Sequence, residues 1–289
     1  MANVALRTNR PPRLRTGRGK RTAVSVVGLI VALLFLFPTY WMVSTAFKPA
    51  GDIITSSYDL IPFHLTFKHF TDAVGKPGFG TYLRNSLMVT LGALILALFC
   101  GLLAALPLAR MRFRGRKGFL MLVLCAQLAP FEALLIPMYL MMRRFDLDTS
   151  LVSLLLIYFV STLPFTIWTL RGFISGIPVD LEEAALVDGC SRWKAFWKVT
   201  FPLLGPGLVA TSVYAFITAW NEFLYAFVLM QDSSHYTLPV WLATFQTAFG
   251  TDWGGAMAAS SLFTIPVLVF FLLVQRNLVS GVTAGAVKG

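Results

Sequence analysis

The side chains that could carry out covalent or metal chemistry are few and scattered in this sequence. It contains three cysteines and three histidines, and none of them falls at a C-x-x-C or metal-ligand spacing. Cys100 and Cys125 stand in apolar runs, where cysteine usually packs as a small hydrophobic residue. Residues 17–22, GRGKRT, lack the G-x-x-x-x-G-K-S/T spacing that cradles phosphates, and no strand precedes them. We therefore expect no catalytic residue, no metal site and no nucleotide site in this chain.

Two carboxylates stand inside long apolar segments. Glu222 directly follows Trp220 and Asn221, and Glu132 follows Pro130. An ionisable residue at membrane depth is a functional candidate by default, so these residues could line a polar path. Two other roles remain open: Glu222 could hydrogen-bond between helices, and Glu132 could bond backbone groups that the proline frees.

A third candidate is the charged stretch EEAALVDGCSRWKAFWKVTFPLLGPG, which runs from Glu182 to Gly207 between two apolar segments. Asp180 and Glu183 have the spacing of a capping box, which predicts that a short helix begins at Asp180. Ala184 and Ala185 on that helix would let another backbone approach closely. A projecting helix with such a face is suited to docking against a partner, although an amphipathic connector is the simpler alternative.

The same stretch continues through a turn into a second short helix. Asp188 and Gly189 form a turn signal. Pro202 can occupy the first turn of the next long helix. One face of the second helix is aromatic and another carries lysines, which suits the membrane surface; the aromatic residues are Trp193, Phe196 and Trp197.

The elements that must position these residues are membrane helices. The chain has 289 residues, of which 57% are hydrophobic and 13% are charged, whereas soluble domains carry about a quarter charged residues. A spanning helix needs about 20 mostly apolar residues. Six segments meet that length, and they are 22–47, 82–109, 118–142, 151–172, 202–230 and 256–279. Prolines inside several of them predict kinks.

The basic residues orient these spans. With the N-terminus inside, 18 of the 24 lysines and arginines lie in inside segments and 6 lie in outside segments. The positive-inside rule then places both termini in the cytoplasm. The net charge of +11 is explained by these flanks, which argues against nucleic-acid binding.

This topology divides the chain into tails, spans and loops. We expect a basic cytoplasmic tail, a six-helix transmembrane domain and a cytoplasmic C-terminal tail, at 1–21, 22–280 and 281–289. The charged stretch becomes a cytoplasmic loop, 173–201. Two long loops lie outside, at 48–81 and 231–255.

The charged stretch resembles the EAA motif of ABC-importer permeases. Nine positions carry the resemblance: Glu183, Ala184, Ala185, Asp188, Gly189, Phe196, Val199, Pro202 and Pro206. Other segments are similar to the carbohydrate-importer branch, in particular its maltose-type second permease. They are YLRNSL (82–87), PLARMRFRGRKG (107–118), TAWNEFLYAF (218–227) and QRNLVSGVTAGAVKG (275–289). The chain departs from the motif at Cys190, where alanine is usual.

The resemblance implies an all-α fold of the ABC type I importer permease class, in the bacterial cytoplasmic (inner) membrane. It implies that the EAA loop couples to a separate ATPase through Glu183, Ala184, Ala185, Asp188, Gly189 and Pro202. Glu183 would meet a basic residue of that ATPase, and it could also keep its capping role. ATP and Mg²⁺ would be bound by the ATPase and not by this chain.

The resemblance also implies a cargo and partners. Trp220, Asn221 and Glu222 become candidates for a sugar path. The loop 231–255 is similar to a segment that reaches into the solute-binding protein, with Gly250, Thr251, Asp252 and Trp253 near its tip. The C-terminal TAGAVKG resembles a tail that contacts the ATPase pair. The expected partners are a homologous permease, two ATP-binding subunits, an extracytoplasmic solute-binding protein, the sugar and the lipid bilayer.

The residues give less support to two other classes of function. An intramembrane enzyme needs convergent reactive side chains at membrane depth, and no histidine stands in any predicted span. An ion-coupled secondary carrier often has inverted repeats, and no such halves are evident. We therefore expect a non-enzymatic permease subunit of an ATP-driven sugar importer, with the identity of the sugar left open.

Overall fold

The structure is a computed structural model of the whole chain, and it describes residues 18–55, 60–62, 64–247 and 250–275. Most of the N-terminal tail and all of the C-terminal tail predicted at 281–289 lie outside these ranges, as does TAGAVKG. The side chains of 18–21 are likewise outside the description. The described part is almost entirely helical.

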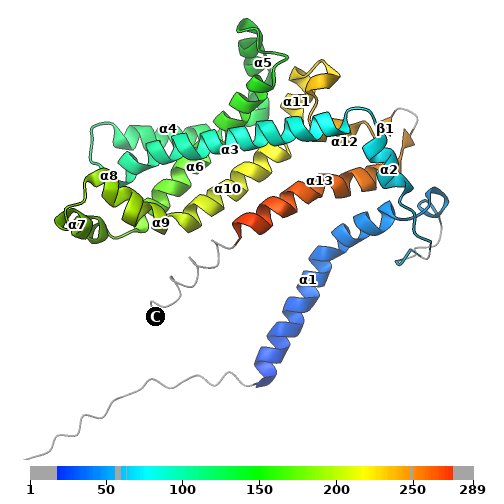
Figure 1. Cartoon of the computed structure of the whole chain (residues 1–289), viewed down its shortest axis with the longest axis horizontal. Coiled ribbons are helices and arrows are strands. Elements are labelled where there is room, and N and C mark those ends of the chain that lie inside the picture. The colour runs from blue at the N-terminus through cyan, green and yellow to red at the C-terminus, as the bar shows by residue number, and fades with distance from the viewer. Residues whose placement is uncertain (1–17, 56–59, 63, 248–249, 276–289) are drawn as a thin grey trace, which may run out of the picture.

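Long helices make up the body of the molecule (Figure 1). They are α1 (Arg18–Ala46), α3 (Phe79–Arg110), α4 (Arg116–Leu128), α6 (Leu151–Gly176), α10 (Gly205–Trp220) and α13 (Trp253–Val274). Shorter helices connect or extend them: η1 (Ala50–Asp52), α2 (Lys68–Gly75), η2 (Phe131–Leu134), α5 (Leu135–Arg144), α7 (Val179–Val187), α8 (Arg192–Ala195), η3 (Phe196–Thr200), α9 (Phe201–Leu203), α11 (Leu224–Leu229), η4 (Ser233–His235) and α12 (Leu238–Ala243). The two strands, β1 (Gln246–Thr247) and β2 (Gly250–Thr251), form one antiparallel pair.

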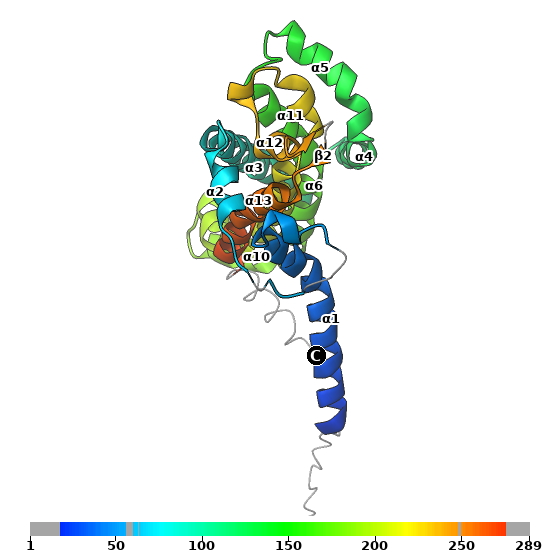
Figure 2. The same cartoon turned by 90° about the vertical axis from the view of Figure 1, so that its right-hand side faces the viewer.

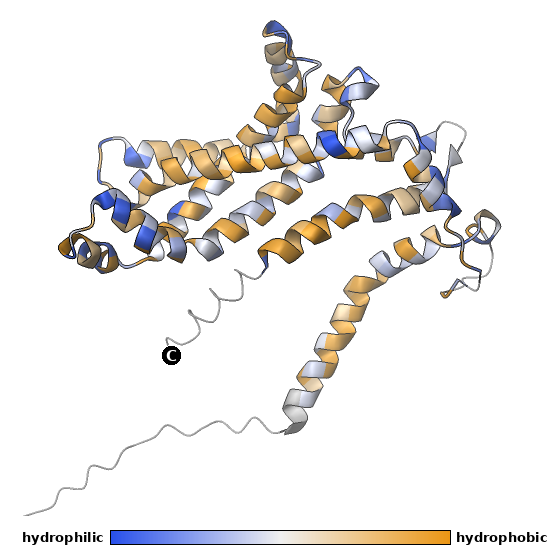
Figure 3. Ribbon diagram, viewed as in Figure 1, coloured by the Kyte–Doolittle hydropathy of each residue, from blue (hydrophilic) through white to orange (hydrophobic). Residues whose placement is uncertain are grey.

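The membrane-helix prediction is confirmed for most spans. Within the described residues, five helical segments are long and apolar enough to cross a bilayer, and a sixth is counted if a bent pair forms one span. The fold class is therefore an all-α membrane protein, as the apolar segments predicted. Figure 3 shows the long helices as mostly hydrophobic, with hydrophilic segments at the two ends of the bundle.

The third span, predicted as one helix over 118–142, is instead broken. Helix α4 ends at Leu128, and the axis turns by 89° before the segment η2–α5. The cause is Pro130, which has no N–H to donate and disfavours helical backbone at Ala129. Ala129 is accordingly extended, with φ −62° and ψ 132°. Helix α5 therefore stands away from the bundle (Figure 2).

The centre of the bundle is the pairing of α3 with α6, which pack along much of their length. Gly101 makes this approach possible, because a Cβ there would lie 2.5 Å from Cγ2 of Thr166. Small residues at membrane helix interfaces allow this kind of contact between backbones. Helix α10 packs against both helices, so α3, α6 and α10 form the frame on which the candidate sites are placed.

The two predicted loop regions lie at opposite ends of this frame (Figure 1). Helices α7, α8 and α9 gather at one end, and α2, α12 and the two strands gather at the other. The arrangement agrees with placing 173–201 and 231–255 on opposite sides of a membrane. Helix α1 contacts α13 near one end and then diverges from the bundle in both views (Figures 1 and 2).

Two buried residues of α3 hold the 231–255 region in place. The side-chain amide of Asn85 donates to the carbonyl oxygens of Ser234 and Tyr236, at 2.9 and 3.0 Å. The hydroxyl of Ser86 accepts from the backbone N–H of Leu238 at 2.7 Å. The YLRNSL segment therefore has a clear physical role, which is to fix the loop's entry into α12.

We expect Asn85→Leu to lower the free energy of unfolding by roughly 1–3 kcal/mol, because two buried carbonyl groups lose their donor. The matched control is Gln231→Leu, since the Gln231 amide bonds the carbonyl of Val228 at an exposed position. That variant should change stability by less than about 0.5 kcal/mol. Thermal unfolding of the detergent-purified chain measures both, and equal shifts would contradict the anchoring role of Asn85.

Candidate functional site

The first candidate site is the segment 179–190, called here the coupling bend, which consists of α7 and the turn that closes it. The predicted capping box is wrong: Pro178 occupies the N-cap position, no side chain caps the helix, and Asp180 lies inside the first turn. Pro178 has extended backbone, with φ −57° and ψ 134°. Because proline can directly precede a helix but cannot continue one, the helix begins at the next residue, Val179.

The predicted turn at Asp188 and Gly189 is present and ends α7. Gly189 has φ +82°, the left-handed conformation that glycine adopts without steric penalty. Its N–H donates to the carbonyl of Leu186, and the N–H of Cys190 donates to that of Ala185, both at 3.0 Å. This pair of bonds is the Schellman arrangement, which satisfies the last carbonyls of the helix.

The predicted docking residues lie on the outer side of the coupling bend. Glu183, Ala184 and Asp188 are exposed, and Ala185 is half-buried. Glu183 makes no hydrogen bond or ion pair with any other described residue. The small residues and the acid are therefore available to another molecule, while Pro202 lies farther along in the first turn of α9, also exposed.

A neighbouring acid, Glu182, was not predicted as a site residue, and it attaches the coupling bend to the bundle. Arg110, at the end of α3, forms an ion pair with it, with Nη2 2.8 Å and Nε 2.9 Å from Oε1. The hydroxyl of Thr200 donates to the same oxygen at 2.8 Å. Arg110 also donates from Nη2 to the carbonyl of Ile177 at 3.1 Å. The two side chains of the pair are only 14% and 23% exposed.

This network joins both arms of the 173–201 loop to a transmembrane helix. The sequence offered two signals for this pair: an arginine at the end of a predicted span, Arg110, and a second acid next to Glu183, which is Glu182. Their separation of 72 residues hid the pairing, since nothing in the spacing shows that α3 ends beside α7.

The second short helix differs from the prediction in one respect. Trp193 and Trp197 are exposed, as expected for an aromatic surface, but Phe196 is only 7% exposed and packs in the core with Leu170 and Leu204. The helix changes to π geometry at η3, where the N–H of Phe201 bonds the carbonyl of Phe196. The aromatic trio is therefore divided between the surface and the core.

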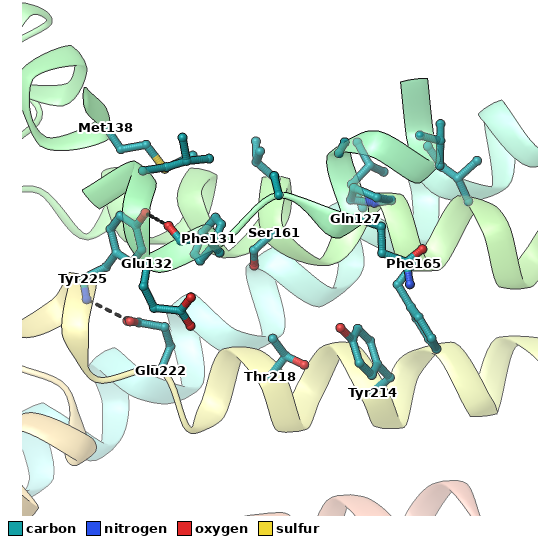
Figure 4. Close-up of a pocket in the computed structure, with 18 of the residues that line it drawn as sticks. Gln127, Phe131, Glu132, Met138, Ser161, Phe165, Tyr214, Thr218, Glu222 and Tyr225 are labelled. Carbon is teal, nitrogen blue, oxygen red and sulfur yellow. Dashed lines mark hydrogen bonds between the residues drawn. The ribbon is translucent and has the colours of Figure 1, made fainter. Parts of the chain in front are cut away.

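The second candidate site is a cavity of about 790 Å³ between α4, α6 and α10 (Figure 4). It lies where two spans are interrupted, one at Pro130 and the other between α10 and α11. Its size is within the range of about 300–1,000 Å³ usual for small-molecule sites. Its polar lining residues are Gln127, Glu132, Ser161, Tyr214, Thr218, Asn221 and Glu222.

Glu222 repairs the interruption between α10 and α11. Its Oε1 accepts from the N–H of Tyr225 at 2.8 Å, and its Oε2 accepts from the hydroxyl of Tyr158 at 2.7 Å and from the N–H of Ala226 at 3.3 Å. The interhelical role left open by the sequence is therefore the role that the geometry shows. Both carboxylate oxygens are occupied, which leaves Glu222 little capacity for a ligand.

Tyr225, not Glu132, bonds a backbone carbonyl next to the break at Pro130. Its hydroxyl donates to the carbonyl of Phe131 at 2.8 Å. Glu132 forms no hydrogen bond or ion pair with another described residue through its side chain and is exposed to the cavity. Figure 4 shows Glu132 and Glu222 near each other at one end of the space.

The other end of the cavity is aromatic. The rings of Phe165 and Tyr214 stack with centroids 3.7 Å apart. Tyr214, Thr218 and Asn221 lie at i, i+4 and i+7 on α10, which puts them on one helix face. That spacing indicates a polar stripe along an apolar span. The sequence analysis did not identify Tyr214 and Thr218 as members of this stripe.

Trp220 does not line the cavity, in contrast to the predicted group of Trp220, Asn221 and Glu222. It is 1% exposed, its indole N–H donates to the carbonyl of Phe263 at 3.2 Å, and its ring stacks on Phe216. Successive residues of a helix point about 100° apart, so Trp220 faces α13 while Asn221 faces the cavity.

The loop 231–255 is more ordered than a simple loop. Asp252 caps α13 by accepting from the N–H of Gly255 at 2.9 Å, and Trp253 begins that helix with 46% of its surface exposed. Gly250 and Thr251 form β2. At the start of the loop, bonds from the backbone N–H and the hydroxyl of Ser234 hold the pKa of the exposed Asp232 carboxyl below its usual value.

No group of three or more His, Cys, Asp or Glu side chains within the described ranges could hold a metal ion. The three cysteines are free. The chemistry that the two sites offer is therefore binding by aromatic rings, amides, hydroxyls and carboxylates.

We expect Glu182→Ala to lower the free energy of unfolding by roughly 2–3 kcal/mol, because Arg110 and Thr200 lose a partly buried acceptor. Its neighbour provides the control: Glu183→Ala should change stability by less than about 0.5 kcal/mol, since Glu183 is exposed. Unfolding of the two detergent-purified variants distinguishes the acids. A larger effect at Glu183 than at Glu182 would refute the assignment.

Comparison with known proteins gives the family. The model of the family "Binding-protein-dependent transport system inner membrane component" matches residues 97–284. The diacetylchitobiose uptake system permease protein DasC of Streptomyces coelicolor is 49% identical over 265 residues, covering 92% of this chain and 96% of that protein.

Two solved structures share the fold. A bacterial ABC transporter involved in the import of the acidic polysaccharide alginate matches with a TM-score of 0.75 and 23% identity, over 92% of this chain and 99% of its own. A bacterial alginate ABC transporter in complex with an alginate pentasaccharide-bound periplasmic protein matches with a TM-score of 0.66 and 18% identity, over 90% and 94%. This chain, with its bundle of apolar helices, belongs to the family of binding-protein-dependent transport system inner membrane components.

Proposed function

We propose that this chain is a permease subunit of an ATP-driven sugar importer of the cytoplasmic membrane. It would pair with a homologous permease, two ATP-binding subunits and an extracytoplasmic solute-binding protein. ATP and Mg²⁺ bind in the ATPase subunits, so this chain contributes the path and the mechanical connection. Both termini lie in the cytoplasm, in agreement with the distribution of 18 and 6 basic residues between the two sides.

The observation that carries the coupling proposal is the two-sided construction of the coupling bend. Its inner acid, Glu182, is tied to Arg110 of α3 by a partly buried ion pair. Its outer residues, Glu183 and Ala184, are exposed and make no contacts that the fold needs. A partner bound to the outer face of the coupling bend would therefore move α3 and α10 through the bonds that Glu182 makes on the inner face. ATP-driven closure of the ATPases supplies that movement.

The cargo proposal is supported by the cavity and by the names of the relatives. Stacked aromatic rings suit the apolar face of a pyranose, and the free carboxylate of Glu132 with Thr218 and Asn221 suits its hydroxyl groups. DasC is a diacetylchitobiose uptake permease. We propose an oligosaccharide cargo and take diacetylchitobiose as the first compound to test.

The loop 231–255 is proposed to contact the solute-binding protein. It lies at the end of the bundle opposite the coupling bend (Figure 1), and Asn85 and Ser86 bond its first part at residues 234–238. The exposed Trp253 and the residues Gly250, Thr251 and Asp252 are the proposed contact. An anchored loop of this kind can press against a partner without collapsing onto the bundle.

The coupling proposal predicts that Glu183→Gln reduces ATP-dependent uptake by about tenfold while insertion and thermal stability stay normal, because one charge-assisted contact with the ATPase is lost. The assay is sugar uptake by proteoliposomes holding the complete transporter. Uptake that persists without ATP and follows an ion gradient would instead indicate a secondary carrier.

A cysteine cross-link supplies the independent check. With the three native cysteines replaced, Ala184→Cys should cross-link to an ATPase subunit in intact membranes, because Ala184 is exposed. Val152→Cys, on the exposed face of α6 at the opposite end, is the control and should not. Failure of the Ala184 position, with normal assembly, would contradict the docking role.

The cargo proposal predicts different results for the two cavity carboxylates. Glu132→Gln should reduce uptake by roughly ten- to hundredfold, the loss of one hydrogen bond to a charged group, without changing stability. Glu222→Ala should lower both uptake and the melting temperature, because it opens the break between α10 and α11. Equal stability losses in the two variants would contradict the separation of roles.

A further inference from the structure

A second hollow, with a basic lining, lies outside the cavity at the turn between α3 and α4, close to the Arg110 that bonds the coupling bend. It has a volume of about 580 Å³ and is lined by Arg112, Arg116, Lys117 and Arg171, together with glycines and apolar residues. No carboxylate is among the lining residues. Within the described part of the chain, none of these four cations forms an ion pair.

Two of the cations are incompletely satisfied. The Nε atoms of Arg116 and Arg171 are buried and have no hydrogen-bond partner among the described residues. Arg171 lies over the ring of Trp168, with its guanidinium carbon 5.4 Å from the ring centroid. A buried donor without a partner is unfavourable, so both arginines are poised for an acceptor that enters the hollow.

The backbone adds to the positive potential. Helix α4 begins at Arg116, its N-cap is Gly115 in the left-handed conformation, and no side chain caps it. The first N–H groups of a helix have no partner within the helix and favour an anion. Here the helix has 13 residues and its open end is at the hollow. The ligand that fits is a phosphate or another compact oxyanion.

The surroundings of the hollow favour a lipid as the source of that phosphate. Phe113, which lines the hollow, is 46% exposed, and Met121 on α4 is 62% exposed. An acyl chain can follow this apolar side of α4 while the headgroup occupies the basic end. Basic side chains at the end of a membrane helix attract anionic lipids, at about 1 kcal/mol for each.

We propose that the hollow at the α3–α4 turn binds the phosphodiester headgroup of an anionic phospholipid, through Arg112, Arg116, Lys117 and Arg171 and the start of α4. The site shares no lining residue with the sugar cavity, and it needs no assumption about the cargo.

The test is a titration of the full-length chain in detergent with phosphatidylglycerol, followed by native mass spectrometry. Phosphatidylcholine provides the arm with no net headgroup charge. We expect saturable binding of phosphatidylglycerol and weaker binding of phosphatidylcholine. The double variant Arg116→Gln/Arg171→Gln should bind phosphatidylglycerol roughly thirtyfold more weakly, at about fivefold for each lost cation.

The matched control is Arg143→Gln/Arg144→Gln, which removes the same charge from the end of α5. It should bind phosphatidylglycerol as the parent does. A third variant, Arg116→Lys/Arg171→Lys, keeps the charge and should retain most of the binding, which excludes loss of fold as the cause. Equal weakening in the α5 control would overturn the proposal, as would unchanged binding in the first variant.

A competition arm separates the two sources of phosphate. Added inorganic phosphate should leave lipid binding almost unchanged, because it lacks the acyl contact along α4. If inorganic phosphate displaces phosphatidylglycerol fully, or if phosphatidylcholine binds equally well, the lipid proposal is wrong. If assembly with the ATPase subunits displaces the lipid, the hollow is a protein contact and the proposal likewise fails.

Discussion

The structure depends on one constraint: inside a bilayer, a backbone group that loses its helical partner must find another within the protein. Two neighbouring spans are interrupted, one at Pro130 and the other after Trp220, and the interruptions lie side by side. Tyr225 donates its hydroxyl to the carbonyl of Phe131, while its own N–H donates to Glu222. Glu222 is held in turn by Tyr158 of α6. The breaks therefore stabilise each other, and the space between them is the cavity.

The opposite solution operates at the end of the bundle that carries the coupling bend. There a charged side chain connects the segments, since Arg110 at the end of α3 bonds the side chain of Glu182 and the carbonyl of Ile177. Thr200 brings the start of the next span to the same carboxylate. The Arg110–Glu182 pair is partly buried. Removing one partner should therefore lower the free energy of unfolding by more than the loss of an exposed ion pair does. The coupling bend is thus fixed to the bundle on its inner side and exposed on its outer side.

The sequence predicted the elements well and their interruptions poorly. Hydropathy was sufficient for most of the spans, and the EAA motif was sufficient for the family resemblance, because both are local properties of the sequence. The turn at Gly189 was also predictable, since it needs a residue that tolerates positive φ. The break at Pro130 was treated as a kink, because the sequence does not say whether a neighbour can satisfy the freed carbonyl. The pairing of Arg110 with Glu182 and the inward turn of Trp220 depend on which helix faces lie together, which spacing along one chain does not give. Of the two roles left open for Glu222, the structure shows hydrogen bonds to α6 and to the start of α11.

The π turn at η3 has a consequence for the orientation of the coupling bend about the helix axis. A π turn accommodates one residue more than an α turn, and one residue corresponds to about 100° of rotation. Thr200 is the last residue of that turn, so the extra residue is what brings its hydroxyl round to Glu182. Deleting one residue from η3 would restore α geometry and rotate α8 about the helix axis relative to α10. The π turn at η3 therefore sets the angle about the helix axis at which α8 lies relative to α10.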